Sequence, residues 1–217
     1  MQSLRIYLAG EEILLHPLRV LFHAKEKTML LADLHLGKAR HFRRGGIPTP
    51  LEANQKDLQN LESLIEGLQP KRILFLGDLF HSELNADWEV FTQFIKRFPD
   101  IAFELVEGNH DILARRHYEA SGIKLHAIPL PYGPFLLSHE PLKDIPKGSY
   151  NLCGHIHPGV TLAGKGRQRL RLPCFFFGER QGILPAFGQM TGAVRLEPKR
   201  EDRVYVIARE QVVQVGA

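Results

Sequence analysis

The chain has 217 residues, of which 44% are hydrophobic and 24% are charged, and its formal net charge is +4. These values are ordinary for a globular protein that is long enough to bury a sizeable core. They exclude a fibrous or low-complexity chain, and no apolar stretch approaches the roughly 20 residues that a membrane-spanning helix needs. We therefore expect a single domain over residues 1–217.

Four short runs that read as strands open the chain, and turns at Gly10-Glu11 and His16-Pro17 separate the first three. The four runs are Leu4–Leu8, Glu12–Leu15, Arg19–Phe22 and Thr28–Ala32. A basic segment over residues 38–46 follows and reads as a loop. The next element is a helix with Thr49 as its N-cap, Pro50 at its first position and Glu52 completing a capping box. Leucines at helical spacing continue this helix to Leu68.

The middle of the chain alternates strands and helices. The run Arg72–Leu76 is almost wholly apolar, which is typical of a strand buried on both faces. A helix over Ala86–Arg97, a strand over Ile101–Val106 and a short helix around Ile112–Ala120 follow. Strands dominate beyond residue 122, at Lys124–Ile128, Phe135–Leu137, Tyr150–Cys153, Val160–Leu162, Leu170–Phe177, Ala193–Leu196, Val204–Ala208 and Val212–Val215. This order predicts a layered α/β sandwich with mixed sheets.

The compartment and the charge distribution bear on possible partners. The N-terminus lacks a basic region followed by an apolar core, and two cysteines are too few for a disulfide framework, so we expect a cytoplasmic protein.

The charges are distributed unevenly along the chain. Residues 48–111 carry 5 Lys and Arg against 12 Asp and Glu. Residues 1–47 carry 8 against 4, and residues 164–209 carry 10 against 4. This pattern indicates either a solvated surface or a polyanionic partner that touches the basic ends.

Five polar motifs occur in a fixed order, and each follows a run of predicted strand residues. They are Asp33-Leu34-His35, Gly77-Asp78, Gly108-Asn109-His110-Asp111, Ser138-His139-Glu140 and Gly154-His155-Ile156-His157. Ligand sites in open α/β sheets form at the carboxyl ends of strands. We therefore expect the five motifs to converge at one edge of the fold.

Together the motifs supply the ligands for two divalent metal ions. The first ion would bind Asp33, His35 and His157, the second would bind Asn109, His139 and His155, and Asp78 would bridge the two. Mixed imidazole and oxygen donors suit manganese, iron, zinc or cobalt better than calcium. Two carboxylates against two divalent cations leave a formal charge near +2, which attracts phosphate and makes hydroxide available as the nucleophile.

One histidine of these motifs is not needed as a ligand. His110 could stabilise the transition state or protonate the leaving oxygen, and Asp111 could orient its ring. The two residues are therefore the predicted catalytic pair. By contrast, Cys153 lies two residues before a ligand and is predicted to be a small buried residue, not a nucleophile.

The order of the motifs resembles that of the calcineurin-like metallophosphoesterase superfamily. Within it, the chain is similar to the bacterial ligase-associated DNA damage response group, on the strength of Asp33-Leu34-His35-Leu36-Gly37-Lys38, Gly77-Asp78-Leu79-Phe80-His81-Ser82 and the chain length. The resemblance implies a four-layer αββα sandwich and the metal roles given above. It also implies manganese-dependent phosphomonoesterase, phosphodiesterase or nuclease chemistry, and a part in DNA repair beside a DNA ligase.

The chain departs from many phosphatases of that superfamily in one respect. In those phosphatases the Gly-Asp motif is followed by a further Asp and by an Arg that binds the substrate phosphate. In this chain the first Lys or Arg after Gly77-Asp78 is Lys96. This argues against a protein phosphatase. Phosphate contacts would then come from the basic segment, with His81 at the rim of the site. The predicted substrate-binding residues are Lys38, Arg40, Arg43, Arg44 and His81.

Three functions fit the sequence. The first is a phosphodiesterase that acts on nucleic acid, such as single-stranded or damaged DNA, for which Phe42 could stack on a base and the run Lys165–Arg171 could form a rim. The second is hydrolysis of a small nucleotide or another phosphoester, which the short chain favours because it leaves little room for a capping domain. The third is a non-catalytic interaction module on the same fold, which the complete ligand set opposes.

Overall fold

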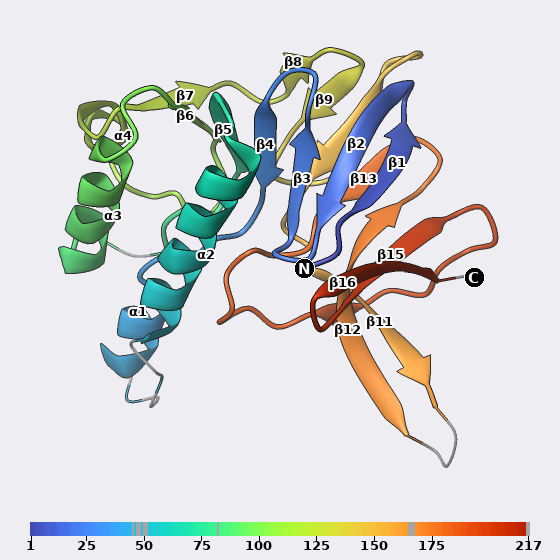
Figure 1. The fold of residues 1–217 in the computed structure, drawn as a ribbon. Helices are drawn as coiled ribbons and strands as arrows, with labels where there is room; N and C mark the ends of the chain where they lie inside the picture. Colours follow the sequence, from blue (N-terminus) through green and yellow to red (C-terminus); the bar gives the residue numbers. More distant parts are fainter. Residues whose placement is uncertain (45, 47–48, 50–51, 82, 165–167, 216–217) are drawn as a thin grey trace.

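The computed structural model describes residues 1–44, 46, 49, 52–81, 83–164 and 168–215. Two mixed β-sheets pack face to face, and helices cover the outer side of the first sheet (Figure 1). This confirms the predicted α/β class with two mixed sheets flanked by helices. The helices are α1 (Lys38–Arg44), α2 (Glu52–Leu68), α3 (Ala86–Lys96) and α4 (Arg115–Ala120). All four precede Ser121.

The first sheet has seven strands in the order of the chain. They are β1 (Leu4–Leu8), β2 (Glu11–His16), β3 (Val20–His23), β4 (Thr28–Leu31), β5 (Arg72–Leu76), β6 (Ala102–Val106) and β7 (Ile123–His126). The strands from β1 to β4 are antiparallel and are joined by short turns. Strands β4 to β7 are parallel, and helices α2, α3 and α4 form their crossovers. The carboxyl ends of β4, β5 and β6 therefore lie side by side.

The second sheet has nine strands from the C-terminal half. They are β8 (Leu130–Tyr132), β9 (Phe135–Leu137), β10 (Tyr150–Cys153), β11 (Pro158–Ala163), β12 (Arg169–Phe177), β13 (Gln181–Ile183), β14 (Val194–Arg195), β15 (Arg203–Ala208) and β16 (Gln211–Val215). The order is β14-β11-β12-β13-β10-β9-β8, and β15 pairs with β12 and with β16. The parallel pair β9 and β10 places two more strand ends at the same edge as those of the first sheet. The β11–β12 hairpin projects away from the body of the fold (Figure 1).

Two apolar cores hold the layers together. The larger core lies between the first sheet and its helices, and it contains an aromatic group in which Trp88 and Phe91 of α3 contact Phe75, Phe80 and Tyr118. The other lies between the two sheets and includes Leu30, Leu74 and Leu152. Strands β3 and β4 are buried along their whole length, and β5 is buried at all but its first residue, because each has a core on both faces. Strand β10 is also buried along its whole length, with Tyr150 and Leu152 in the core between the sheets.

The structure differs from the sequence expectations at two places. Residues 38–44 of the segment expected to be a loop form helix α1, in which Ala39 is fully buried. The Thr49 hydroxyl donates to the carbonyl of Ala39 and so ties this residue to α1, while the predicted start of the next helix at residues 50–51 lies outside the described residues. Strands β8 and β13 were not predicted, because Pro131 lies in the first and Gly182 in the second, and both residue types are unfavourable within strands.

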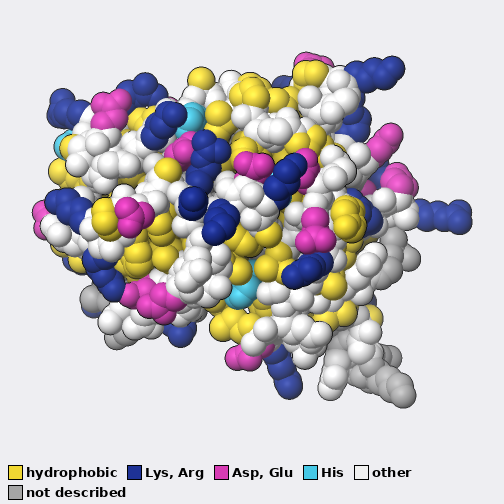
Figure 2. Space-filling view, turned by 45° about the horizontal axis from the view of Figure 1, so that its top comes forward, with side chains coloured by type: hydrophobic (Ala, Val, Ile, Leu, Met, Phe, Trp, Pro, Cys, Tyr) yellow, Lys and Arg dark blue, Asp and Glu magenta, His cyan; other side chains and the backbone are white. Residues whose placement is uncertain are grey.

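The surface mixes charges of both signs. On the face in Figure 2, Lys and Arg side chains lie among Asp and Glu side chains, with hydrophobic side chains between them. The acidic and basic segments of the sequence therefore do not form separate charged patches on this face. None of the described helices is long and apolar enough to cross a membrane.

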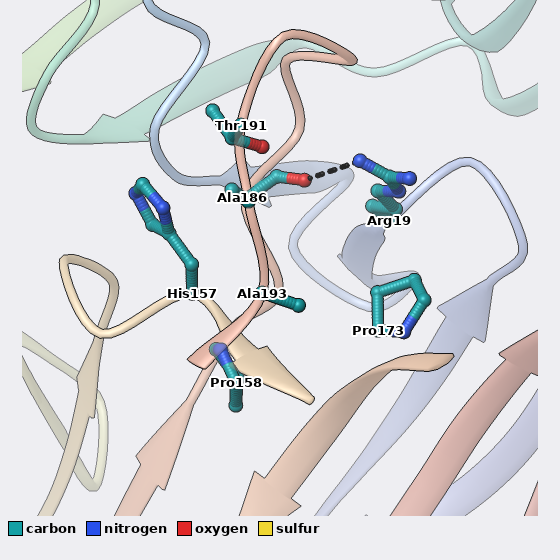
Figure 3. Close-up of a pocket in the computed structure, with 8 residues that line it drawn as sticks. Arg19, His157, Pro158, Pro173, Ala186, Thr191 and Ala193 are labelled. Atoms are coloured by element: carbon teal, nitrogen blue, oxygen red, sulfur yellow. Dashed lines mark hydrogen bonds between the residues drawn. The ribbon is translucent and has the colours of Figure 1, made fainter. Parts of the chain in front are cut away.

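A buried carboxylate of α2, Asp57, lies close enough to Arg19 in the turn between β2 and β3 for the Arg19 charge to influence it. The Asp57 carboxylate is 3% exposed and accepts the backbone N–H of Gln189. Nearby, the Arg19 guanidinium donates to the carbonyls of Ala186 and Gly188 at 3.0 and 3.4 Å. Figure 3 shows the first of these bonds. Burial raises the pKa of Asp57 to about 7, although the Gln189 N–H and the charge of Arg19 act in the opposite direction.

This raised pKa predicts a pH-dependent stability. Between about pH 4 and 7 the folded state binds the Asp57 proton more tightly than the unfolded state does, so the free energy of unfolding should fall as pH rises, by at most about 1.4 kcal/mol per pH unit. Asp57→Asn should flatten that slope, since the amide can still accept from Gln189. Urea unfolding at a series of pH values tests this, with the exposed Asp100→Asn as the matched control. Equal slopes in the wild type and Asp57→Asn would contradict the prediction.

Candidate metal centre

Five strand ends supply the polar side chains of the site. Asp33 follows β4, Asp78 follows β5, Asn109 follows β6, His139 follows β9 and His155 follows β10. Backbone hydrogen bonds tie the first two loops together, from Asp33 N–H to the Gly77 carbonyl at 3.2 Å and from His35 N–H to the Asp78 carbonyl at 2.8 Å. The predicted convergence of the motifs therefore follows from parallel strands that end at one edge.

The first group of ligand atoms contains Asp33, His35 and His157, and its members lie within 4.8 Å of one another. The two imidazole Nε2 atoms are 3.4 Å apart, and His157 Nε2 lies 3.3 Å from Asp33 Oδ1. Asp33 is fully buried and also accepts the backbone N–H of His155. The side chains of this group thus converge on one point and could hold one cation.

The second group contains Asp78, His139 and His155, again within 4.8 Å of one another. His139 Nε2 lies 3.1 Å from His155 Nδ1 and 3.3 Å from Asp78 Oδ1. The Asn109 amide oxygen lies 3.0 Å from the same His139 nitrogen, so it belongs to this group. The structure therefore brings all the predicted ligand side chains together in the two sets that the sequence suggests.

Asp78 lies between the two groups. Its Oδ1 faces His139 of the second group, and its Oδ2 lies 3.6 Å from His35 Nε2 of the first. A carboxylate that presents one oxygen to each group can serve as a shared ligand. Asp78 is 2% exposed, and its Oδ1 also accepts the backbone N–H of His110 at 2.9 Å, which fixes its rotamer.

Several of these residues adopt a strained backbone conformation. Of the ten described non-glycine residues with positive φ, five are predicted ligands. They are Asp33, His35, Asp78, His155 and His157, with φ between 50° and 65°. Such conformations cost about 1–2 kcal/mol each for residues other than glycine, and they cluster at functional sites. The surrounding fold holds these loops in shapes that turn the side chains inward.

The chemistry of the donors fits divalent metal ions. Two buried carboxylates without a counter-charge would be costly in the interior. His139 donates its Nδ1–H to the Leu76 carbonyl at 2.9 Å, which is the outer-shell contact typical of a ligating imidazole whose Nε2 faces a metal. Burial, followed by the charges of Lys38 and neighbouring histidines, lowers the pKa of His35 to about 2, so this imidazole is neutral, as a ligand must be.

The two predicted catalytic residues, His110 and Asp111, differ in exposure and in contacts. The His110 side chain is 42% exposed and its Nε2 lies 4.0 Å from Asp78 Oδ2, so it borders the site from the solvent side. Asp111 is turned inward, and its carboxylate accepts three backbone N–H groups, from Leu79, Phe80 and Gly108. These bonds brace the loop after β5 against the loop after β6. The expected orientation of the His110 ring by Asp111 is therefore replaced by a contact to the backbone.

His81 lies directly beside His110. The two ring centroids are 4.0 Å apart with an interplanar angle of 38°. His81 Nδ1 also lies 3.2 Å from His35 Nδ1, on the side of that ring away from its metal-facing nitrogen. The sequence suggested His81 as a rim residue, and the structure puts it within reach of both a predicted ligand and the predicted catalytic histidine.

The predicted phosphate-binding cations of α1 have different surroundings. Lys38 is partly buried, and Asp78 and Asp33 raise its pKa while burial, the larger effect, lowers it. Arg40 is held by Asp87 of α3 through two hydrogen bonds of 3.1 Å, and Arg43 donates to the carbonyl of Thr49. The side chain of Arg44 lies outside the described residues, as do residues 165–167 of the basic run Lys165–Arg171. Among the described cations of α1, Lys38 is therefore the one whose pKa is influenced by the predicted metal ligands Asp33 and Asp78.

Glycine is required where the motif loops cross. A Cβ on Gly154 would lie 2.5 Å from Ala32 Cβ and 2.5 Å from Asp33 Oδ2. We expect Gly154→Ala to displace Asp33, to weaken metal binding and to destabilise the fold by more than about 2 kcal/mol. Gly67→Ala is a matched control, because a Cβ in α2 there meets nothing within 4 Å and should be neutral or slightly stabilising. Thermal unfolding and titration with manganese would measure both effects, and unchanged metal affinity in Gly154→Ala would contradict the expectation.

One part of the site gave no strong signal in the sequence. A cavity of about 480 Å³ adjoins the second group and is lined by Asn109, His139, Ile128 and the segment from Glu140 to Lys143. The lining residues come from three separate loops and include ordinary apolar types. Sequence reasoning missed them because nothing but the tertiary fold brings them together.

The comparisons with known proteins agree with this geometry. The family model described as calcineurin-like phosphoesterase matches residues 26–177. The crystal structure of Pseudomonas putida nuclease MPE aligns with 99% of this chain and 100% of its own, with a TM-score of 0.84 and 28% identity. A phosphoesterase from E. coli, Yfce, aligns at a TM-score of 0.44 and 14% identity over 87% of this chain and 98% of its own, which is too distant to add to the argument. A search of curated proteins gave no match.

The family match covers well over half of the chain and spans all five motifs. The two ligand groups lie inside the matched region, and the nuclease structure aligns over nearly the full length of both chains. The chain therefore belongs to the calcineurin-like phosphoesterase family and is a metal-dependent phosphoesterase.

Proposed function

We propose that the protein hydrolyses phosphodiester bonds in nucleic acid, with two metal ions held at the two ligand groups. The observation that carries the proposal is the position of Asp78, which turns one oxygen toward each group. Two-metal sites are suited to in-line displacement at phosphorus, since the ions supply Lewis acidity to the attacking and leaving oxygens. The likeness to a chain titled a nuclease supports nucleic acid as the substrate.

The protein side chains have separable tasks in this proposal. Asp33, His35 and His157 hold the first ion, Asn109, His139 and His155 hold the second, and Asp78 binds both. His110 is solvent-accessible at the rim and is placed to donate a proton to the leaving oxygen or to stabilise the negative charge that develops on the phosphate. His81, whose ring lies against that of His110, and Lys38 would contact a non-bridging phosphate oxygen.

Three finer points extend this proposal. Manganese is the proposed metal, on the basis of the mixed imidazole and oxygen donors, with iron, zinc or cobalt as the other candidates. A role in DNA repair in association with a DNA ligase rests on the resemblance of the motifs to the ligase-associated group. A cytoplasmic location rests on the two cysteines, which are both buried and unpaired.

A second candidate function is hydrolysis of a small nucleotide. The cavity beside Asn109 and His139 favours it, because about 480 Å³ is enough space for a single nucleoside. Binding of a DNA strand should weaken steeply as salt concentration rises, whereas binding of a mononucleotide should change little. The salt dependence of KM therefore separates the two substrates.

The proposal is tested by hydrolysis of bis(p-nitrophenyl) phosphate, p-nitrophenyl phosphate and single-stranded DNA, each with manganese and with chelator. Diester hydrolysis and strand cleavage that both require manganese would support the proposal. Diester hydrolysis without strand cleavage would favour the small nucleotide. A protein that binds two metal ions and hydrolyses none of the three would overturn the proposal and would direct attention to a binding partner.

A further inference from the structure

A cavity of about 480 Å³ opens directly beside the second ligand group, and its shape and lining indicate a ligand. Asn109 and His139, two predicted ligands, form one of its walls. Ile128, Pro141 and Leu142 supply apolar surface, and Ile128 is 51% exposed although it is a large aliphatic residue. A group that occupies the cavity would therefore lie next to a phosphate held at the metal centre.

The far wall of the cavity is rigid before any ligand binds. Asn151 is fully buried on β10, and its amide group donates to the Leu136 carbonyl and to Ser138 Oγ. The amide oxygen of Asn151 accepts the backbone N–H of Leu142 at 3.2 Å. Ser138 Oγ in turn donates to the Glu140 carbonyl. This buried network fixes the segment 138–142, so the cavity is preformed and binding would cost little ordering of the chain.

The charges around the cavity are unfavourable for a phosphate. The lining contains Glu107 and Glu140 against the single cation Lys143. No described residue of α1 lines the cavity, and Lys38 of that helix is instead close enough to Asp33 and Asp78 to be influenced by their charges. A polyanionic backbone would therefore pass over the α1 side, and the cavity is suited to an uncharged, flat and partly apolar group.

We infer that this cavity binds the nucleobase of a nucleotide attached to the scissile phosphate. The inference rests on the proposed phosphodiesterase function and adds a base-binding subsite to it. A base fits the volume, packs against Ile128 and Leu142, and leaves its phosphate at the metal centre. Contact between a base and a hydrophobic or aromatic surface contributes substantially to the binding of single strands.

The acidic lining adds a preference among bases. Glu107 pairs with Arg115 at 3.7 Å, whereas Glu140 makes no ion pair among the described residues and is exposed at the mouth of the cavity. A carboxylate accepts hydrogen bonds from the exocyclic amino group of cytosine or adenine, and thymine has no such group. The subsite therefore favours amino-bearing bases over thymine.

The test uses esters that all release p-nitrophenol. The substrates are the 3′- and 5′-(p-nitrophenyl) phosphates of deoxycytidine and of thymidine, with methyl p-nitrophenyl phosphate as the substrate without a nucleoside. In the manganese-loaded wild type, kcat/KM for the better nucleoside ester should exceed that for the methyl ester by on the order of tenfold. The two ester positions cover either orientation of the nucleotide across the metal centre.

Two sets of variants then assign the effect to the cavity. Ile128→Ala, alone and combined with Leu142→Ala, should bring the ratio of nucleoside to methyl ester toward one without changing kcat/KM for the methyl ester. Glu140→Gln should reduce the preference for deoxycytidine over thymidine. Val90→Ala, an equally exposed aliphatic residue on α3, is the matched control and should change neither ratio. The single Ile128→Ala variant keeps the test valid if the double variant does not fold.

The outcomes separate this inference from the function on which it rests. A wild type that hydrolyses nucleoside and methyl esters equally well, or a ratio that the double variant leaves intact, overturns the base subsite alone. Selective hydrolysis of nucleoside esters without cleavage of single-stranded DNA supports the subsite and replaces the nuclease by a small-nucleotide enzyme. Failure to hydrolyse any diester overturns the proposed function, and the subsite with it.

Discussion

Asp78→Asn is expected to lower kcat/KM for phosphodiester hydrolysis by on the order of 10³-fold. The amide keeps the size of the side chain and can still accept the backbone N–H of His110. It loses the negative charge that the two ligand groups share, and its nitrogen has no lone pair to offer to a second cation. We therefore expect the variant to bind manganese more weakly and to hold fewer than two ions.

The same substitution should have the opposite effect on the metal-free protein. Asp33 and Asp78 are both buried, and Asp78 also contributes to raising the pKa of Asp111 to about 7, although burial of Asp111 is the larger cause. Removing one of these charges relieves repulsion, so Asp78→Asn without metal should be at least as stable as the wild type. Isothermal titration with manganese and thermal unfolding in chelator measure the two effects. Full activity with two bound ions would contradict the assigned role of Asp78.

His110→Ala is expected to lower kcat by about 10²–10⁴-fold while manganese binding stays unchanged. The His110 side chain is 42% exposed and borders the site without belonging to either ligand group. Its contact with Asp78 through the backbone N–H survives the substitution. The loss should therefore fall on the chemical step and leave the metal content intact, which is the reverse of the pattern expected for Asp78→Asn.

The control for this variant is a histidine outside the candidate site. His117 lies on α4 and has no assigned role, so His117→Ala should leave kcat unchanged. The rates are measured with bis(p-nitrophenyl) phosphate, and the metal content is measured by elemental analysis of the purified protein. A His110→Ala variant with nearly full kcat would remove this residue from the proposed mechanism and leave the adjacent His81 as the candidate proton donor.

The positions of the strand ends could be predicted from the sequence with few errors. The mainly apolar runs before Asp33, Asp78 and Asn109 form strands that are buried on both faces. The end of each strand could be predicted because polar motif residues follow the run. Because parallel strands end at one edge of a sheet, the order of the motifs was enough to predict that their side chains meet. The family resemblance depended on the same residues, and the family match confirms it.

Local sequence misled the prediction where a tertiary contact overrides it. Residues 38–44 carry many cations and precede two glycines, which is typical of a loop, yet burial of Ala39 and the bond from Thr49 stabilise helix α1. Asp111 follows His110 directly, which suggested a contact between them. In the folded chain the His110 side chain is partly exposed, whereas the Asp111 carboxylate is buried and accepts backbone N–H groups of Leu79 and Gly108.

The sequence by itself therefore determined the class of fold, the residues that can bind metal and the division of those residues into two sets. Only the tertiary structure decided which oxygen of Asp78 faces which group, that Arg40 is held by Asp87, and that a cavity lies beside Asn109 and His139. The physical reason is the separation along the chain of the residues that interact. Strand ends and ligand types are set by residues close in the chain, whereas rotamers, ion pairs and cavities depend on side chains that folding brings together from distant segments.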